Sequence, residues 1–332
     1  MNLKDKNIIL HVGAHKTATT FLQDKLFINL KNTYCHIRKH KFNLALERDK
    51  KKINPIYQLY DFEEVLKFDE LTLEEFKKNL RSYLNQIEEK NIIISAEGLV
   101  GTLHNAYSNN KQYVAILKKL LPEAKIVLVI RKEDDWFQSV YNQLVIKKDR
   151  YISLKTFLGY KNGNFQKRIY FGHYFKAPFD VRSLNWLNIF NNFTEAFGNK
   201  RVLLLPYEMF QETPDKFLEY FYIFTNITPY YPDQYEYLNK SYNQNNYTTK
   251  MTLYNYFFMF WSCYISNRII RNYLKNNDEF FVKILKIPCP DYKYEKEIVT
   301  SEMKQKLNYI FSDSNKKLSS LININLGLYG YY

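Results

Sequence analysis

The sequence predicts an α/β fold in which a parallel β-sheet is flanked by helices. Four short apolar runs, each of the length expected for a buried strand, alternate with segments of helical periodicity. Strands that alternate with helices are typical of parallel sheets with right-handed crossovers. The predicted strands are 8–12, 91–95, 125–130 and 201–205.

The first predicted strand leads directly into a turn and the start of a helix. Gly13 permits a sharp turn, and Lys16 with the small residues 17–20 follows. A helix start presents unpaired N–H groups and a partial positive charge, and small side chains let an anion approach that backbone. This stretch therefore predicts a phosphate or sulfate cradle, and a P-loop-like sheet.

The nucleotide-triphosphatase pattern G-x-x-x-x-G-K-[ST] does not match this stretch. There is no second glycine, and Lys16 comes before the threonines. An ATPase is therefore not the first interpretation. An ordinary strand-to-helix turn with a surface lysine is the alternative to the anion cradle.

Helical periodicity predicts helices between and after these strands. A capping box at Thr72 begins one helix, and Ser183 is the cap of another. Thr213 as a cap with Pro214 at the first position marks the start of a further helix. Residues 61–68 are weakly helical, and no element is assigned to the basic segment 31–52. Beyond the first, the predicted helices are 72–87, 108–121, 133–147, 183–197, 213–224, 249–275 and 301–321.

The chain changes character near residue 228, where a segment rich in Tyr, Asn and Pro begins. We therefore expect an α/β core over 1–228 and a C-terminal loop and helical extension over 229–332 packed on it. The helix 249–275 has an aromatic face and two arginines. It suits a membrane surface or an acidic glycan, but docking of its aromatic face onto the core is the favoured interpretation.

The net charge of +14 favours anionic partners such as a nucleotide, a nucleic acid, an acidic glycan or a membrane surface. The N-terminus does not read as a signal peptide, and no apolar run approaches a membrane span. Three widely spaced cysteines, Cys35, Cys263 and Cys289, indicate reduced thiols. We therefore expect a cytoplasmic protein, with peripheral membrane contact through 249–275 as a further option.

Ligands of parallel sheets bind beyond the carboxyl ends of the strands. Polar and charged residues follow all four predicted strands, so one edge of the sheet is the expected site. These residues are 13–20, 95–97, Arg131 and 207–208.

These motifs resemble the sulfotransferase superfamily, which uses 3′-phosphoadenosine 5′-phosphosulfate (PAPS). The bacterial branch has a strand followed by G-x-x-K-T-G-T-T-x-x-Q, and residues 13–23 match it with Ala18 in place of one glycine. Four further motifs of the superfamily are met along the chain, and the first motif and the one at Arg131 occur in order and in the expected strand–helix context. They are Arg131 with Asp135, Ser139 and Tyr141; Pro206-Tyr207-Glu208; Ser95 with Glu97; and Asn239 with Ser241.

The resemblance implies roles for individual residues. Lys16 and the backbone of 17–20 would hold the 5′-phosphosulfate, and Arg131 with Ser139 would hold the 3′-phosphate. From the residues alone, Arg131 in an ion pair with Asp134 or Asp135 and Ser139 as a helix-face hydroxyl are the alternatives. The full set of expected cofactor-binding residues is Gly13, His15, Lys16, Thr17, Ala18, Thr19, Thr20, Arg131, Ser139, Tyr207, Asn239 and Ser241.

Sulfuryl transfer to a hydroxyl needs a group that stabilises the leaving oxygen and usually a base. Lys16 would neutralise charge on the bridging oxygen. The candidate bases are Glu97, then His104, with His40 a distant third; Glu97 as an acid at a helix start is the alternative. His11 and His15 have the spacing of metal ligands but lack a further ligand, so no metal is expected.

The predicted activity is transfer of a sulfuryl group from PAPS to a hydroxyl of a carbohydrate or lipid-linked glycan in a bacterial cytoplasm. An atypical P-loop nucleotide or sugar kinase is the alternative, disfavoured because no clear Mg²⁺-binding Asp follows a strand. A nucleic-acid-binding protein is the third hypothesis. No recognition motif supports it, so we expect no nucleic-acid partner.

Overall fold

The computed structural model describes residues 3, 5–37, 55–144, 153–166, 180–232, 235 and 298–332. Several predicted features lie outside these residues and stay predictions. They are His40, Asn239, Ser241, the helix 249–275, the side chain of His104, and two of the three cysteines.

The described residues fall into two compact units. Those within Met1–Trp136, Arg182–Leu238 and Leu307–Tyr332 form the first, and those within Phe137–Val181 and Asn239–Lys306 form the second. The boundary expected near residue 228 stays a prediction.

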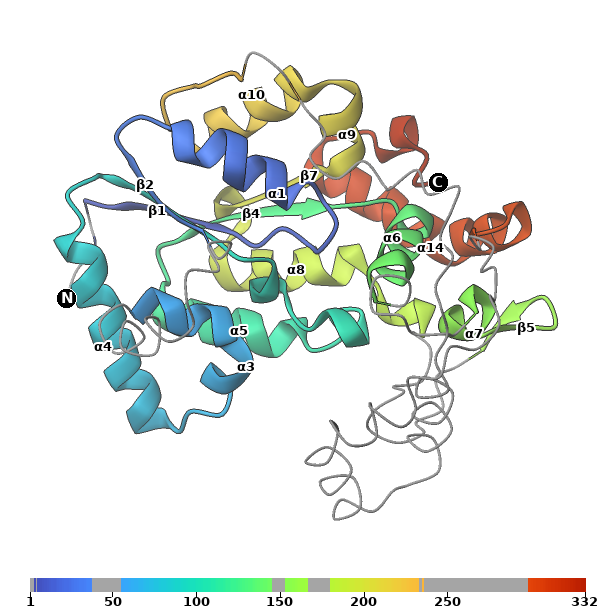
Figure 1. Cartoon of the computed structure of the whole chain (residues 1–332), viewed down its shortest axis with the longest axis horizontal. Helices are drawn as coiled ribbons and strands as arrows, with labels where there is room; N and C mark the ends of the chain where they lie inside the picture. Colours follow the sequence, from blue (N-terminus) through green and yellow to red (C-terminus); the bar gives the residue numbers. More distant parts are fainter. Residues whose placement is uncertain are drawn as a thin grey trace, which may run out of the picture. The chain divides into compact units, whose positions relative to one another are not determined.

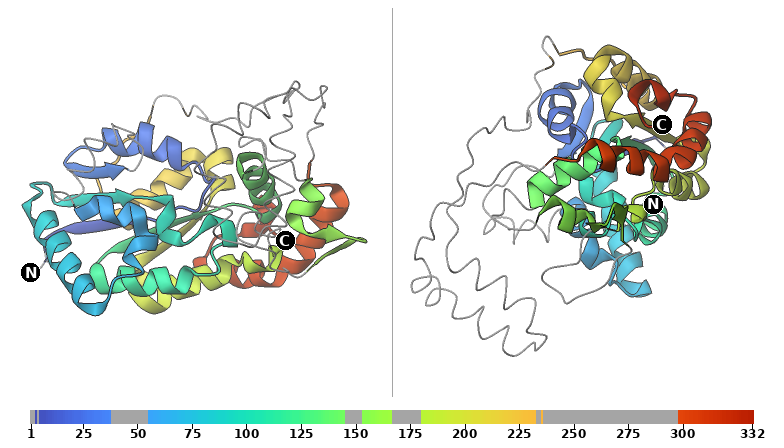
Figure 2. Two further views of the ribbon diagram at one scale, coloured as in Figure 1. Left: turned by 60° about the horizontal axis from the view of Figure 1, so that its bottom comes forward. Right: turned by 90° about the vertical axis from the view of Figure 1, so that its right-hand side faces the viewer.

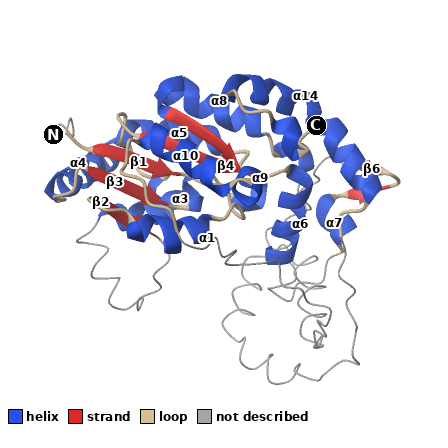
Figure 3. Cartoon of the chain, turned by 90° about the horizontal axis from the view of Figure 1, so that it is seen from above, coloured by secondary structure: helices blue, strands red, loops and turns tan. Residues whose placement is uncertain are grey.

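The first unit is built on a five-stranded sheet in which every neighbouring pair is parallel. The strand order is β2-β3-β1-β4-β7, and Figure 3 shows β2, β3 and β1 side by side. Four strands confirm the predicted apolar runs, and nearly all their interior residues are buried, as in a sheet with both faces covered. The strands are β1 (Asn7–His11), β2 (Thr33–Ile37), β3 (Asn91–Ser95), β4 (Lys125–Ile130) and β7 (Val202–Pro206).

Helices cover both faces of this sheet, as predicted (Figure 1). The views of Figure 2 agree that α4, α5 and α8 lie on one face, with α1 and α10 on the other. Phe21 of α1 contacts Phe210 of α9, and Phe27 of η2 contacts Phe221 of α10. The helical segment after β1 therefore packs against α9 and α10. The bounds are α1 (Thr19–Phe21), η1 (Leu22–Leu26), η2 (Phe27–Asn29), η3 (Pro55–Asp61), α3 (Phe62–Val65), α4 (Glu70–Gln86), α5 (Asn110–Leu120), α8 (Trp186–Phe197), α9 (Tyr207–Glu212) and α10 (Pro214–Thr225).

Three helix starts differ from the predicted ones, and one of them is that of α5, which begins at Asn110 rather than at residue 108. Helix α4 begins before Thr72, because Asp69 is its cap and accepts a hydrogen bond from the Thr72 amide at 2.8 Å. Helix α8 is capped by Asn185 rather than Ser183. The start of α10 is as predicted, with Pro214 as its first residue.

The second unit contains most of α6 (Glu133–Leu144), the short α7 (Leu154–Leu158) and a hairpin of β5 (Tyr160–Lys161) and β6 (Asn164–Phe165). Tyr141 packs against Phe157, with ring centroids 5.4 Å apart. Helix α14 (Ser301–Ile322) confirms the last predicted helix and begins in this unit. In the described part of the chain, no helix is both long and apolar enough to cross a membrane.

Candidate functional site

The loop between β1 and α1 is anchored on strand β4. The Ala14 amide donates to the Val129 carbonyl at 3.0 Å, and Thr17 Oγ1 donates to the Ala14 carbonyl at 2.5 Å. Lys16 (φ 72°) and Ala18 (φ 58°) are both left-handed. When right-handed and left-handed residues alternate, successive backbone N–H groups point into one concavity, and such a concavity binds anions. Two such residues lie in this loop, and its role as an anion cradle stays a prediction.

A buried polar network lies beneath this loop. His11 Nδ1 is 2.7 Å from Ser95 Oγ, which also accepts a hydrogen bond from Gln23 Nε2 at 2.8 Å. Burial lowers the pKa of His11 to about 3, so its ring is neutral. A Cβ at Gly13 would lie 2.8 Å from His11 Nε2. A side chain at this position would therefore force the ring or the loop to shift, and the φ of Gly13 is not left-handed.

An aromatic cluster holds His15 from the other side. The His15 amide donates to the Tyr107 hydroxyl at 2.9 Å, and its carbonyl accepts from Trp136 Nε1 at 3.0 Å. Tyr107, Trp136 and Trp186 are buried against one another, with ring centroids 5.6 to 6.1 Å apart. His15 is predicted to contact a phosphate or the acceptor. Its backbone is held by these protein groups, and its contact with a ligand stays a prediction.

Arg131 follows β4 and lies beside the same loop. Its Nη1 donates to the Lys16 carbonyl at 3.2 Å, and its guanidinium carbon lies 4.9 Å from the centroid of the Tyr207 ring. The Arg131 carbonyl accepts from Trp186 Nε1 at 3.0 Å. Two strand ends predicted to share one site are therefore in direct contact.

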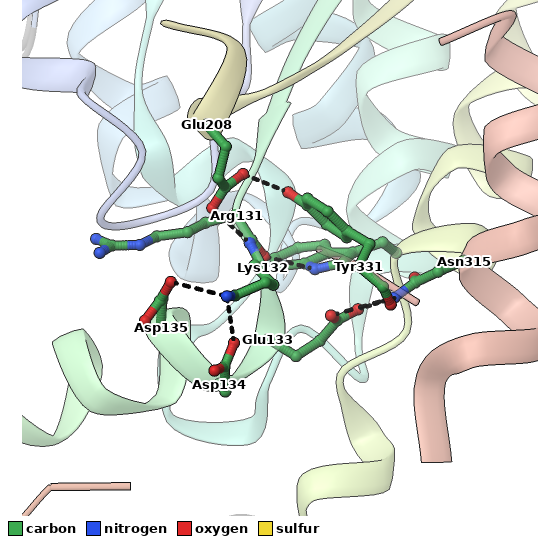
Figure 4. A network of polar contacts seen from close by, with 9 residues as sticks. Arg131, Lys132, Glu133, Asp134, Asp135, Glu208, Asn315 and Tyr331 are labelled. Carbon is green, nitrogen blue, oxygen red and sulfur yellow. Dashed lines mark hydrogen bonds and ion pairs between the residues drawn. The ribbon is translucent and has the colours of Figure 1, made fainter. Parts of the chain in front are cut away.

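The alternative of an ion pair from Arg131 to the following acidic residues is not what the structure shows. Lys132 Nζ lies 3.5 Å from Asp134 and 3.4 Å from Asp135 (Figure 4). Arg131 instead stacks on Tyr207. Its planar cation is thus held by an aromatic face and a carbonyl, neither of which neutralises it.

Glu208, next to Tyr207, is buried and bonded on both carboxylate oxygens. Oε1 accepts from the Lys132 amide at 3.0 Å, and Oε2 accepts from the Tyr331 hydroxyl at 2.8 Å. Burial raises the pKa of Glu208. Tyr331 was not among the predicted residues, since no motif or periodicity marks it.

Of the three candidate bases, Glu97 is the one whose side chain the structure describes. Glu97 Oε2 lies 3.9 Å from His15 Nε2, and its side chain is 34% exposed. It follows β3 at the start of a short 3-10 turn, Glu97–Val100, so both the catalytic and the helix-start interpretations remain compatible with its position. His104 lies in a second such turn, Leu103–Asn105.

Ser139 lies on α6 within the second compact unit, half-buried, and its predicted contact with the 3′-phosphate stays a prediction. Thr19 is buried while Thr20 is partly exposed, both at the start of α1. Among the residues that the structure describes, no group of three or more His, Cys, Asp or Glu side chains is arranged to hold a metal ion.

Comparison with known proteins concerns the family and the fold of the chain. The family described as "Sulfotransferase domain" matches residues 8–180. A crystal structure of a sulfotransferase from Alicyclobacillus acidocaldarius is similar, with a TM-score of 0.52, 13% identity, and 97% of this chain and 98% of that chain covered. A mouse sulfotransferase, SULT7A1, complexed with PAP also matches, with a TM-score of 0.35, 11% identity and coverage of 96% and 83%. No curated protein sequence matches.

The family match includes the β1 loop, Glu97 and Arg131, and it extends over more than half of the chain. The solved Alicyclobacillus structure has the same α/β fold. The chain therefore belongs to the sulfotransferase family and is a sulfotransferase.

Proposed function

We propose that this sulfotransferase uses PAPS as its donor and transfers the sulfuryl group to a hydroxyl of a carbohydrate or lipid-linked glycan. The observation that carries the donor assignment is the contact between the β1 loop and Arg131. Arg131 Nη1 lies 3.2 Å from the Lys16 carbonyl, so a cradle for one anionic group stands beside a guanidinium suited to a second. A nucleotide with a 5′-phosphosulfate and a separate 3′-phosphate has that pair of anions.

Two unpaired donors support the fit. Thr19 Oγ1 and Arg131 Nε are buried and have no hydrogen-bond partner among the described residues. A buried polar atom without a partner costs free energy, roughly 1–3 kcal/mol, unless a ligand satisfies it. Thr19 is the first residue of α1, and Arg131 directly follows β4. Anionic oxygens at both places would satisfy them.

The donor supplies the activated sulfuryl group. In this proposal the backbone of 17–20 and the Thr19 hydroxyl bind the 5′ end, and Lys16 neutralises the charge that grows on the leaving oxygen. Arg131 binds the 3′-phosphate, with Tyr207 holding its plane. Ser139 is a further proposed 3′-phosphate contact, as are Asn239 and Ser241 for the nucleotide.

For the proton of the acceptor hydroxyl we propose Glu97 as the base. Its carboxylate is partly exposed and lies 3.9 Å from the His15 ring of the cradle loop. An acid beside the loop is well placed to accept a proton from a hydroxyl near the sulfur. His104 and His40 remain the alternatives.

The acceptor class rests on composition. The chain carries a net charge of +14 and contains 30 tyrosines, a combination that suits anionic sugars and stacking on sugar rings. These features support a glycan or glycolipid acceptor. Location in a bacterial cytoplasm, with contact to a membrane surface through 249–275, is proposed on the same sequence grounds.

The deciding experiment compares two ligands and one transfer reaction. Thermal unfolding is followed with adenosine 3′,5′-bisphosphate and with ATP–Mg²⁺, and radiolabelled sulfate transfer from PAPS is screened over neutral glycans, acidic glycans and phenols. Stabilisation by the bisphosphate, with label on glycans, supports the proposal. Stabilisation by ATP–Mg²⁺ alone favours a kinase, and label on phenols alone overturns the acceptor class.

A further inference from the structure

Tyr331 is a buried tyrosine to which the proposed function assigns no role. It follows α14 and is 1% exposed. Its hydroxyl donates to Glu208 Oε2 at 2.8 Å, and burial raises its pKa well above the ordinary value. A buried hydroxyl bonded to a buried carboxylate constrains both partners, because neither has water as a substitute.

Glu208 joins Tyr331 to the end of β4. The register of the sheet places Ile130 opposite Pro206, so the residues after each strand are neighbours. Glu208 Oε1 accepts from the amide of Lys132, the residue after Arg131, and Figure 4 shows both hydrogen bonds of Glu208. The residue before Glu208 is Tyr207, on which the Arg131 guanidinium stacks.

A second bond fixes the Tyr331 backbone. Asn315 Nδ2 donates to the Tyr331 carbonyl at 3.0 Å and lies 3.1 and 3.2 Å from the two carboxylate oxygens of Glu133 (Figure 4). Asn315 is 1% exposed and Glu133 4%. The segment after α14 is thus tied to both sides of the β4–α6 turn that carries Arg131.

The hydrogen bonds of Glu208 also affect how its carboxylate interacts with the Arg131 guanidinium. Arg131 is close enough to Glu208 to lower the pKa that burial raises. A carboxylate with an unsatisfied oxygen would compete with a ligand phosphate for the guanidinium. The Tyr331 hydroxyl and the Lys132 amide occupy both Glu208 oxygens, which leaves Arg131 over Tyr207 and directed toward the loop.

We propose that Tyr331 is a positioning residue for the nucleotide site, which acts through Glu208 to keep the Arg131 guanidinium available for the 3′-phosphate. This inference rests on the proposed function, because it takes Arg131 as the 3′-phosphate contact. It assigns to the segment after α14 a role in donor recognition.

The test is the variant Tyr331→Phe, which removes one hydroxyl and keeps the ring. Binding of adenosine 3′,5′-bisphosphate and of adenosine 5′-phosphate is measured by calorimetry, together with Tm. We expect the Kd of the bisphosphate to rise roughly three- to tenfold, as for loss of one typical hydrogen bond, while the Kd of the monophosphate stays unchanged. The KM for PAPS should rise in parallel with little change in kcat.

Tyr332→Phe is the matched control, because its hydroxyl contacts Ser319 and Asn325 rather than the site. It should leave both affinities as in the wild type. The variant Glu208→Gln gives an independent test. If Tyr331 acts through Glu208, the double variant Tyr331→Phe with Glu208→Gln should bind the bisphosphate at least as tightly as the weaker-binding of the two single variants.

An unchanged bisphosphate affinity in Tyr331→Phe overturns the inference, and so does an equal loss of both nucleotides, which would indicate a structural role. A wild-type chain that binds the two nucleotides equally well overturns the proposed role of Arg131 itself. The two failures are therefore distinguishable.

Discussion

The Arg131 guanidinium donates a hydrogen bond from Nη1 to the Lys16 carbonyl oxygen at 3.2 Å. The two residues follow β4 and β1, which are neighbours in the sheet. Each lies at the carboxyl end of its strand, where ligands of parallel sheets bind. This contact brings together the loop proposed for the 5′-phosphosulfate and the side chain proposed for the 3′-phosphate.

Lys16→Ala should strongly slow sulfuryl transfer and leave the chain folded. Lys16 is left-handed with φ 72°, and alanine has the same Cβ and therefore the same backbone strain. Loss of the ammonium removes stabilisation of the leaving oxygen, and we expect kcat to fall roughly 10²- to 10³-fold. Steady-state transfer from PAPS measures this, with Tm as the check on folding. Lys25→Ala, which removes an exposed lysine of the same segment, is the control; near-normal turnover of the Lys16 variant would exclude Lys16 from the mechanism.

Glu97→Gln should separate catalysis from donor binding. The Glu97 carboxylate lies 3.9 Å from His15, beside the loop, and amide replacement removes its basicity while keeping its shape. We expect kcat to fall roughly 10²- to 10⁴-fold, the range for loss of a general base, with the Kd of adenosine 3′,5′-bisphosphate unchanged. His104→Gln, measured in parallel, tests the competing base. If Glu97→Gln kept its turnover and His104→Gln lost it, the base would be His104 rather than Glu97.

The strands could be predicted because their apolar runs are almost pure, as the buried β1 and β4 show. Strand β2 was missed because Thr33-Tyr34-Cys35-His36-Ile37 is a mixed edge strand without such a run. The start of α4 was misplaced because Asp69 and Thr72 are both good caps and only the fold decides between them.

The site was predictable where it depends on strand ends. Lys16 and Arg131 follow strands that are adjacent, so sheet topology alone brings them together. Its supporting residues were not predictable. Tyr107 reaches His15 from a turn with φ 61°, and Asn315 meets Glu133 across 182 residues of sequence. No local pattern encodes contacts of that kind.

Ala18→Gly should relieve strain in the cradle. Ala18 has φ 58°, a conformation that costs an L-residue roughly 1–2 kcal/mol and glycine almost nothing. After the greater flexibility of unfolded glycine is subtracted, we expect the free energy of unfolding to rise by up to about 1 kcal/mol. The donor nucleotide should bind at least as tightly, since the backbone becomes more accessible. Urea unfolding and calorimetry measure the two effects.

Ala106→Gly is the matched control, because Ala106 is also left-handed, with φ 50°, but ends the turn Leu103–Asn105 and is not part of the β1 loop. Its affinity for adenosine 3′,5′-bisphosphate should equal that of the wild type. A loss of stability in Ala18→Gly would show that the Ala18 methyl contributes more by packing than its backbone costs.

Glu133 should make the protein less stable as pH rises. Burial raises its pKa to about 8, from an ordinary value of 4.5 in the unfolded chain. Between these values the folded state keeps a proton that the unfolded state has lost, so the free energy of unfolding falls with pH and levels off above about 8. Buried Glu208 shifts in the same direction. Urea unfolding at intervals from pH 5 to pH 9 measures the slope.

Glu133→Gln removes this titration while keeping an acceptor for Asn315. The decline between pH 5 and pH 8 should become shallower by up to about 1.4 kcal/mol per pH unit, the limit for one proton. Glu74→Gln, at an exposed position on α4, should keep the wild-type slope. An unaltered slope in the Glu133 variant would mean that Glu133 is ionised in the folded protein.

Gly13→Ala tests the contact between the cradle and the ring beneath it. The new Cβ would lie 2.8 Å from Nε2 of His11, which is 0% exposed, and we expect a loss of about 1–3 kcal/mol in the free energy of unfolding. His11→Ala removes the ring and leaves Gln23 bonded to Ser95. If the clash is the cause, the double variant should be less destabilised than the sum of the two single variants by roughly 1 kcal/mol or more. Urea unfolding of the four proteins of this cycle gives the coupling energy, and additive losses would show that Gly13 is needed for a reason other than His11.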